Sequence, residues 1–155
     1  MNGKLNLDIK QPLTLATLVG AALSLIGSLL PQCVAKIDAF GEVDKTTGHL
    51  MADYAHQGIF ILILSIAAVA ILLFVNKEKV LSGVLGALCA CDIWGLYNVI
   101  KDVSDAKKKI KNSGLEKYAS ANYQIGFFIL VIGTLAVVAA VIIASIREKK
   151  GVAAN

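Results

Sequence analysis

Charged residues are scarce in this sequence. Asp, Glu, Lys and Arg make up 17% of its 155 residues, and 57% are hydrophobic. An ordinary soluble domain is about 45–50% apolar and about 25% charged. The chain also has only two histidines, three cysteines and one tryptophan. This composition, with a mean hydropathy of +0.72, excludes an ordinary soluble domain and indicates an integral membrane protein.

Four segments contain almost no charge: residues 12–34, 58–75, 80–100 and 125–146. A helix needs about 20 predominantly apolar residues to cross a bilayer, because about 30 Å of hydrocarbon is divided by about 1.5 Å per residue. The segments have about this length. A chain this small cannot bury four such helices in a soluble core. We therefore predict one domain over residues 1–155, an all-α membrane protein with four transmembrane helices.

The connections between these segments predict how the helices run. Only four residues, 76–79, separate the second and third segments, and a link this short forces an antiparallel helical hairpin. The loops at 35–57 and 101–124 are longer. We therefore expect an antiparallel bundle with both termini on one side and the two longer loops on the other.

The direction of insertion is less clearly encoded. Lys4 and Lys10 precede the first segment, as in a signal peptide, but that segment is longer than a signal core of about 7–15 residues, so we expect it to be retained. The basic residues are divided almost equally between the two sides. The short link and residues 147–150 directly adjoin helix ends, where positive charge counts most. We therefore predict a multi-pass cell-membrane protein with both termini cytoplasmic.

Small residues recur at four-residue spacing in three segments. Helices in lipid associate by close backbone approach at such positions, so we predict packing seams there, one of which can serve a homo-oligomer or another membrane protein. The residues are Ala16, Gly20, Ser24 and Ser28 in the first segment, Gly83, Ala87, Cys91 and Gly95 in the third, and Ala136, Ala140 and Ala144, near Gly133, in the fourth.

Asp92 is the only formally charged residue inside the four segments. A charge at mid-membrane costs a few kcal/mol and often marks function. Ser24 and Thr134 fall at a similar depth and can hydrogen-bond to the carboxylate. One interpretation is a proton- or cation-carrying carboxylate in a transporter or channel. The other is a packing carboxylate, which we favour because a proton relay normally needs more than one ionisable group.

The first loop contains the only histidines. If residues 49–56 are helical, His49, Asp53 and His56 fall on one face and can ligate Zn²⁺, but no fourth ligand is apparent and we expect no metal or cofactor. In the other long loop, Lys107, Lys108, Lys109 and Lys111 lie between apolar residues at helical spacing. They predict a basic helix that continues the third segment onto anionic lipid headgroups, with a solvated charged face as the alternative and no nucleic acid as partner.

A family resemblance follows from three stretches. They are Gly27 to Pro31, Asp53 followed by Gly58-Ile59, and Tyr123 to Phe128 with Gly133. In these and in its layout the chain resembles a class of small four-helix membrane proteins of Gram-positive bacteria. The resemblance implies cytoplasmic termini and a cell-membrane location. It implies no activity.

The sequence predicts no catalytic site, because it has no phosphate-binding glycine loop, no Ser/His/Asp arrangement and no paired intramembrane carboxylates. The cysteines lack a C-x-x-C pair. We therefore predict a non-enzymatic accessory, sensor or interaction subunit of a membrane assembly. The alternatives are a small transporter or channel that uses Asp92, and an immunity protein against a membrane-active toxin.

Overall fold

The computed structural model describes residues 11–39, 41–75 and 78–153. Lys4, Lys10 and part of the predicted 76–79 link lie outside these residues. Within them, four helices are long and apolar enough to cross a membrane, with candidate spans at Pro12–Leu29, His56–Phe74, Lys79–Asn112 and Ile125–Lys149. The chain is mainly helical, but it also contains a small sheet, so the all-α prediction is wrong in that respect.

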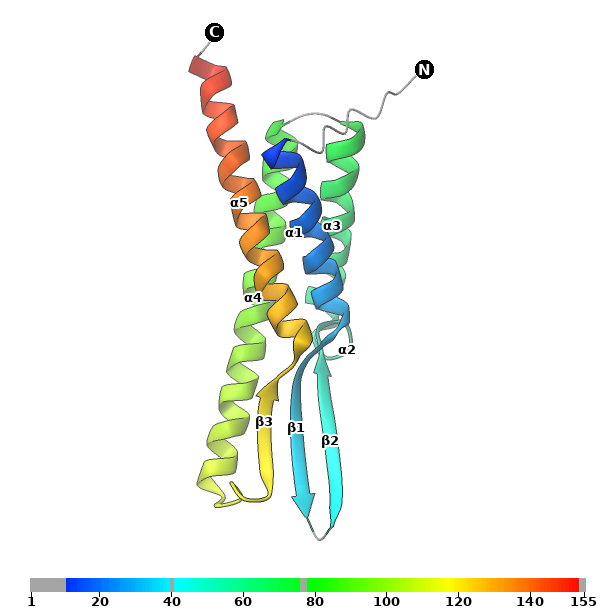
Figure 1. Ribbon diagram of the computed structural model, residues 1–155, viewed down its shortest axis with the longest axis vertical. Coiled ribbons are helices and arrows are strands. Elements are labelled where there is room, and N and C mark those ends of the chain that lie inside the picture. Colours follow the sequence, from blue (N-terminus) through cyan, green and yellow to red (C-terminus); the bar gives the residue numbers. More distant parts are fainter. Residues whose placement is uncertain (1–10, 40, 76–77, 154–155) are drawn as a thin grey trace.

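The elements follow one another with short connections. They are α1 (Pro12–Leu29), β1 (Pro31–Ala39), β2 (Glu42–His49), α2 (Leu50–Asp53), α3 (Ala55–Phe74), α4 (Glu78–Asn112), β3 (Ala119–Tyr123) and α5 (Ile125–Ala153). In Figure 1 the long helices run alternately in opposite directions, and the sheet projects from one end of them. Both α1 and α4 pack against α3 and α5.

Helix α1 ends at Leu29, five residues before its predicted end. Pro31 is the physical cause, because proline disfavours the helical conformation of the residue before it. Leu30 is extended, with φ −83° and ψ 159°. The fully buried Gln32 then donates from Nε2 to the carbonyl oxygens of Gly27 and Leu30, the latter at 3.1 Å. These bonds satisfy carbonyls at the helix end that have no partner within the helix.

The sheet is built from both long loops. Its strand order is β2-β1-β3, and both pairings are antiparallel. Gly41 lies in the turn between β1 and β2 with a φ of 87°, a conformation that glycine adopts without steric cost. The loops therefore form one folded unit with the C-terminal part of α4, which lies beside β3 in Figure 1.

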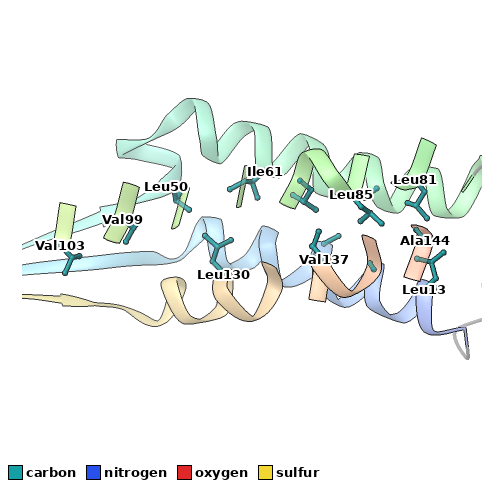
Figure 2. Packing of buried hydrophobic residues seen from close by; sticks show 14 residues of the cluster. Leu13, Leu50, Ile61, Leu81, Leu85, Val99, Val103, Leu130, Val137 and Ala144 are labelled. Carbon is teal, nitrogen blue, oxygen red and sulfur yellow. The ribbon is translucent and has the colours of Figure 1, made fainter. Parts of the chain in front are cut away.

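The apolar core runs along the whole length of the helices. Figure 2 shows Leu13, Leu81 and Ala144 at one end of this core. At the other end Val103, which is 3% exposed, extends the core towards the sheet. Large apolar side chains also point outwards, including Ile63, with 53% of its surface exposed. The helices thus have an apolar interior and an apolar exterior.

Candidate functional site

Asp92 lies on α4 and has no exposed surface. The Ser24 hydroxyl on α1 donates a hydrogen bond of 2.6 Å to Asp92 Oδ2. This bond joins α1 to α4, although each of these helices packs mainly against α3 and α5. A buried carboxylate needs such donors. An unpaired buried polar group lowers the free energy of unfolding by about 1–3 kcal/mol, and an unpaired buried charge lowers it by more.

The second oxygen of the same carboxyl is not satisfied. Asp92 Oδ1 has no hydrogen-bond partner within the described residues, and the same is true of Ser65 Oγ and Thr17 Oγ1. Thr134 is buried on α5, but its hydroxyl donates to the carbonyl oxygen of Leu130 at 2.7 Å. The structure therefore joins Ser24 to Asp92 by a hydrogen bond and places the Thr134 hydroxyl, which donates to its own helix, close to the same carboxyl.

The closest helix contact is the seam between α1 and α5. A Cβ added to Gly133 would lie 2.7 Å from Ser24 N, and one added to Gly20 would lie 2.8 Å from Val137 Cγ2. A Cβ on Gly27 would lie 2.7 Å from Leu130 N. Gly27 belongs to this seam although it lies outside the four-residue series, because a helical face also includes positions three residues apart.

The remaining small residues are not all in seams. On α4, Gly95 is buried, and a Cβ there would lie 3.3 Å from Leu50 Cδ2. By contrast Gly83 has open space around it and is exposed. Gly83 and Ala87, the first two positions of the predicted α4 seam, therefore do not pack within this chain, because α4 turns its other face to α3 and α5. A seam at these positions with a second chain stays a prediction. Of the other predicted residues, Ser28, Ala140 and Ala144 are buried, and Ala16, Cys91 and Ala136 are half-buried.

The histidines do not share one continuous helix. His49 ends β2, α2 covers only Leu50–Asp53, and His56 lies in α3. The His49 backbone N–H donates to Asp53 Oδ2 at 2.6 Å, so this carboxylate holds the turn into α2. Within residues 11–39, 41–75 and 78–153, no three or more His, Cys, Asp or Glu side chains are grouped to hold a metal ion.

The lysine cluster lies on the C-terminal part of α4. The helix continues without interruption to Asn112, and Lys107, Lys108, Lys109 and Lys111 are exposed. The buried Val103 precedes them, and Lys107 Nζ lies 5.6 Å from the centre of the Tyr123 ring. Lys107 therefore lies against the end of β3, while all four lysines keep exposed surface. Contact with anionic lipid stays a prediction.

A cavity of about 240 Å³ lies between part of the sheet and α4. Cys33 lines it together with Asp53 and Asp102. Burial, with smaller effects from the two carboxylates, raises the pKa of the Cys33 thiol, although the Gly48 N–H opposes the shift. A raised pKa leaves less of the reactive thiolate at neutral pH. The three cysteines are free.

Comparisons with protein-family models, with curated proteins and with solved structures find no match to this chain. The sequence and the geometry are therefore the basis for function. They provide a buried Asp92–Ser24 pair, a glycine seam and a folded sheet unit at one end of the helices.

Proposed function

We propose that the four long helices cross a cell membrane as an antiparallel bundle and that the chain is a non-enzymatic interaction subunit. The observation that carries this proposal is the contrast between its surfaces. The outward side chains of the helices are apolar, as at Ile63 and Leu135, which are 53% and 65% exposed. Contiguous apolar surface of this kind is rare on soluble proteins and is suited to lipid.

The sheet unit, defined as β1, β2, β3 and the part of α4 after Ile100, has the opposite character. Along β2, Glu42, Asp44 and Lys45 are exposed, and so are the α4 lysines. A charged surface on a folded support suits recognition of a protein outside the bilayer. The sheet unit also anchors both neighbouring helices, because β1 follows α1 and β3 precedes α5.

For orientation, we propose that the termini are cytoplasmic and the sheet unit is outside. Cysteines substituted singly for Lys108 and for Lys149, in a variant with the native cysteines replaced, test this in intact cells. A membrane-impermeant maleimide is expected to label Lys108→Cys and to spare Lys149→Cys until the cells are opened. The reverse pattern inverts the orientation, and labelling of both from outside refutes the four-span arrangement. The resemblance to the Gram-positive class agrees with this proposal and stays a prediction.

The interaction role is tested by a photo-crosslinking residue at Val43, which is exposed on β2, and by a matched one at the outward Ile142 of α5. We expect a protein adduct of one discrete mass from Val43 in cells and only lipid adducts from Ile142. Charge reversal at Asp44 is expected to weaken the Val43 adduct. No protein adduct from any exposed β2 position would contradict the role.

A small transporter or channel is the second candidate, and the unpartnered Asp92 Oδ1 is the observation that favours it. An intramembrane carboxyl with a free oxygen can accept a proton or bind a cation. The purified protein in liposomes should then show a pH-dependent flux that Asp92→Asn abolishes without loss of expression. A wild-type protein that carries no flux of protons, sodium or potassium removes this candidate.

A further inference from the structure

The sheet has one covered edge and one open edge. Its strand order is β2-β1-β3, so β2 and β3 are the edge strands. Helix α4 contacts β3 and lies beside it, whereas β2 lies on the side of the sheet away from α4 (Figure 1). An edge strand presents unpaired backbone N–H and C=O groups that can pair with another strand. The outer edge of β2 is therefore the place where this sheet can be extended.

The hydrogen bonds of β1 identify which residues of β2 point to the open edge. The Asp38 N–H donates at 2.6 Å to the carbonyl oxygen of Tyr118, which directly precedes β3. Backbone groups alternate between the two sides of a strand, so the adjacent Ile37 points to β2, where it lies opposite Asp44. Asp44 therefore pairs with β1, and alternate residues point outwards. These outward residues are Val43, Lys45 and Thr47.

The outward backbone groups have no partner in the part of the chain that the structure describes. No backbone hydrogen bond outside the sheet ladder involves Val43, Lys45 or Thr47, and all three residues are exposed. Two usual protections of an edge are also missing, since β2 is eight residues long and contains no proline. The pairing of β1 with β2 is irregular only next to Pro31. A partner strand can replace the water at such an edge.

The side chains of β2 select which strand can pair with it. Successive side chains point to opposite faces, so Glu42 and Asp44 share one face. The residue opposite Asp44 on β1 is the uncharged Ile37, and neither carboxylate forms an ion pair with another described residue. Charged edges resist indiscriminate pairing, and opposite charges attract across a strand pair. The two carboxylates therefore favour a strand with lysine or arginine at two positions on that face.

From these observations we infer that the open edge of β2 binds an extended segment of another protein as a fourth strand. The backbone of this segment pairs with Val43, Lys45 and Thr47. Two of its basic side chains, two residues apart, lie opposite Glu42 and Asp44. A second copy of this chain in the same membrane is disfavoured, because in-register pairing of two parallel β2 strands brings identical carboxylates together. The inference rests on the proposed interaction role and specifies the chemistry of the partner.

Short peptides test the backbone pairing. The purified full-length protein in phosphatidylcholine nanodiscs is titrated with a fluorescent heptapeptide that alternates threonine and lysine. We expect saturable binding at millimolar peptide or below. Two methylated forms carry N-methyl groups on the backbone nitrogens of either the threonines or the lysines, so each loses the N–H groups along one edge. Only one edge meets β2, so one form should bind like the parent and the other should lose binding. Equal binding of the two forms, or no binding of the parent peptide, refutes strand addition.

Proline at position 45 tests the same pairing from the side of the protein. Lys45→Pro removes one outward N–H and keeps the pairing with β1, because proline is tolerated where the N–H of an edge strand faces solvent. Lys45→Val removes the same charge and keeps the N–H, so it is the matched control. We expect about ten-fold weaker peptide binding for Lys45→Pro than for Lys45→Val. Equal affinities of the two folded variants contradict the inference. The methylated peptides use the wild-type protein and decide the question if Lys45→Pro does not fold.

The charge preference is tested by a double variant, Glu42→Gln with Asp44→Asn, which keeps the shape of both side chains. We expect it to bind the lysine peptide about five-fold more weakly, because two cross-strand charge pairs are lost. Glu116→Gln, which removes an exposed carboxylate between α4 and β3, is the control and should bind like the wild type. A peptide with glutamate in place of lysine should bind more weakly to the wild type. Equal binding of the two peptides would overturn the inference.

In cells, the photo-crosslinking residue at Val43 separates this inference from the proposed function. Loss of the protein adduct in Lys45→Pro, with its retention in Lys45→Val, supports strand addition. An adduct that persists in Lys45→Pro leaves the interaction role intact and refutes strand addition. An adduct of twice the mass of the chain means that a second copy occupies the edge, which also refutes the inference. Absence of any adduct from exposed β2 positions removes the interaction role and this inference with it.

Discussion

Replacement of single glycines by alanine separates the α1–α5 seam from the outward face of α4. Gly133 and Gly83 both lie inside long helices and both belong to predicted small-residue series. A Cβ on Gly133 would lie 2.7 Å from Ser24 N and 2.9 Å from Leu23 C. A Cβ on Gly83 would meet no atom within 4 Å. The same substitution is therefore expected to have opposite effects at the two positions.

The magnitude follows from two terms. Alanine is favoured over glycine in a helix interior by about 1 kcal/mol, and this gain is common to both variants. It therefore cancels when the two are compared. The overpacking cost, about 1–3 kcal/mol, remains for Gly133→Ala alone. It is expected in the upper part of that range, because the facing atoms belong to the α1 backbone and cannot rotate away.

The assay is equilibrium unfolding of the purified variants in mixed micelles with increasing sodium dodecyl sulfate, followed by circular dichroism. We expect Gly133→Ala to unfold at a lower detergent fraction than the wild type, and Gly83→Ala to unfold at the same or a higher fraction. Gly27→Ala serves as a second seam variant, because its Cβ would lie 2.7 Å from Leu130 N. A Gly133→Ala protein as stable as Gly83→Ala would refute the close α1–α5 contact.

Three further predictions concern single side chains. Ser24→Ala removes the Ser24 hydrogen bond to the buried Asp92 carboxyl and should lower the unfolding free energy by about 1–3 kcal/mol, whereas Ser28→Ala, whose hydroxyl donates to the carbonyl oxygen of Leu25 within α1, should cost less in the same assay. Gln32→Leu removes the donor to the last carbonyls of α1 and should lower the thermal midpoint, with a loss of about 1 kcal/mol; an unchanged midpoint would contradict that role. Because burial raises the pKa of the Cys33 thiol, the rate of its maleimide labelling, measured with the other two cysteines replaced, should still increase with pH above the range where an exposed thiol has levelled off. A rate profile like that of free cysteine would contradict this prediction.

The four helices could be predicted because each is encoded by one strong local signal. An apolar run of about 20 residues is recognisable without knowledge of its neighbours. The predicted ends of the helices are less accurate. Residues 30–34 are apolar or neutral and therefore extend the first predicted helix, although Pro31 directs the chain out of the helix at Leu30. The distal turns of α4 carry charge, so apolar runs alone do not extend the third segment to Asn112, and only the helical spacing of the apolar residues around the lysines predicts this continuation.

The sheet was missed for a different reason. Strands are recognised by alternation of apolar and polar residues, which arises when one face is buried. Residues Glu42 to Thr47 of β2 are all exposed, so no such alternation is present. Five-residue β3 is also too short for a clear pattern. β2 pairs with the adjacent β1 across a tight turn, but β3 is specified by its pairing with β1, which lies far away in the sequence and which a local pattern does not report.

The candidate site shows the same division between local and distant information. Depth along each helix can be counted from the sequence, which places Ser24 level with Asp92. Which face of each helix turns inwards depends on neighbours. That information is absent from the α4 series, so its spacing does not show that Gly83 and Ala87 face outwards from this chain.

The sheet also gives a physical reason for the precise meeting of α1 and α5. Helices in lipid gain little from apolar burial against one another, so sliding along their axes is weakly opposed. Here β1 continues from α1, β3 leads into α5, and the two strands pair from Cys33 opposite Tyr123. The Gln124 N–H also donates to the carbonyl oxygen of Gln32 at 2.8 Å.

A slip of this ladder by one residue would move α5 about 3.3 Å along α1. Gly133 would then no longer face Ser24, and a residue with a side chain would meet the α1 backbone. Because Ser24 is also the donor to Asp92, the strand pairing outside the proposed membrane fixes the position of the one charged residue inside it. The sheet unit is therefore both the proposed recognition surface and the element that sets the register of the helices.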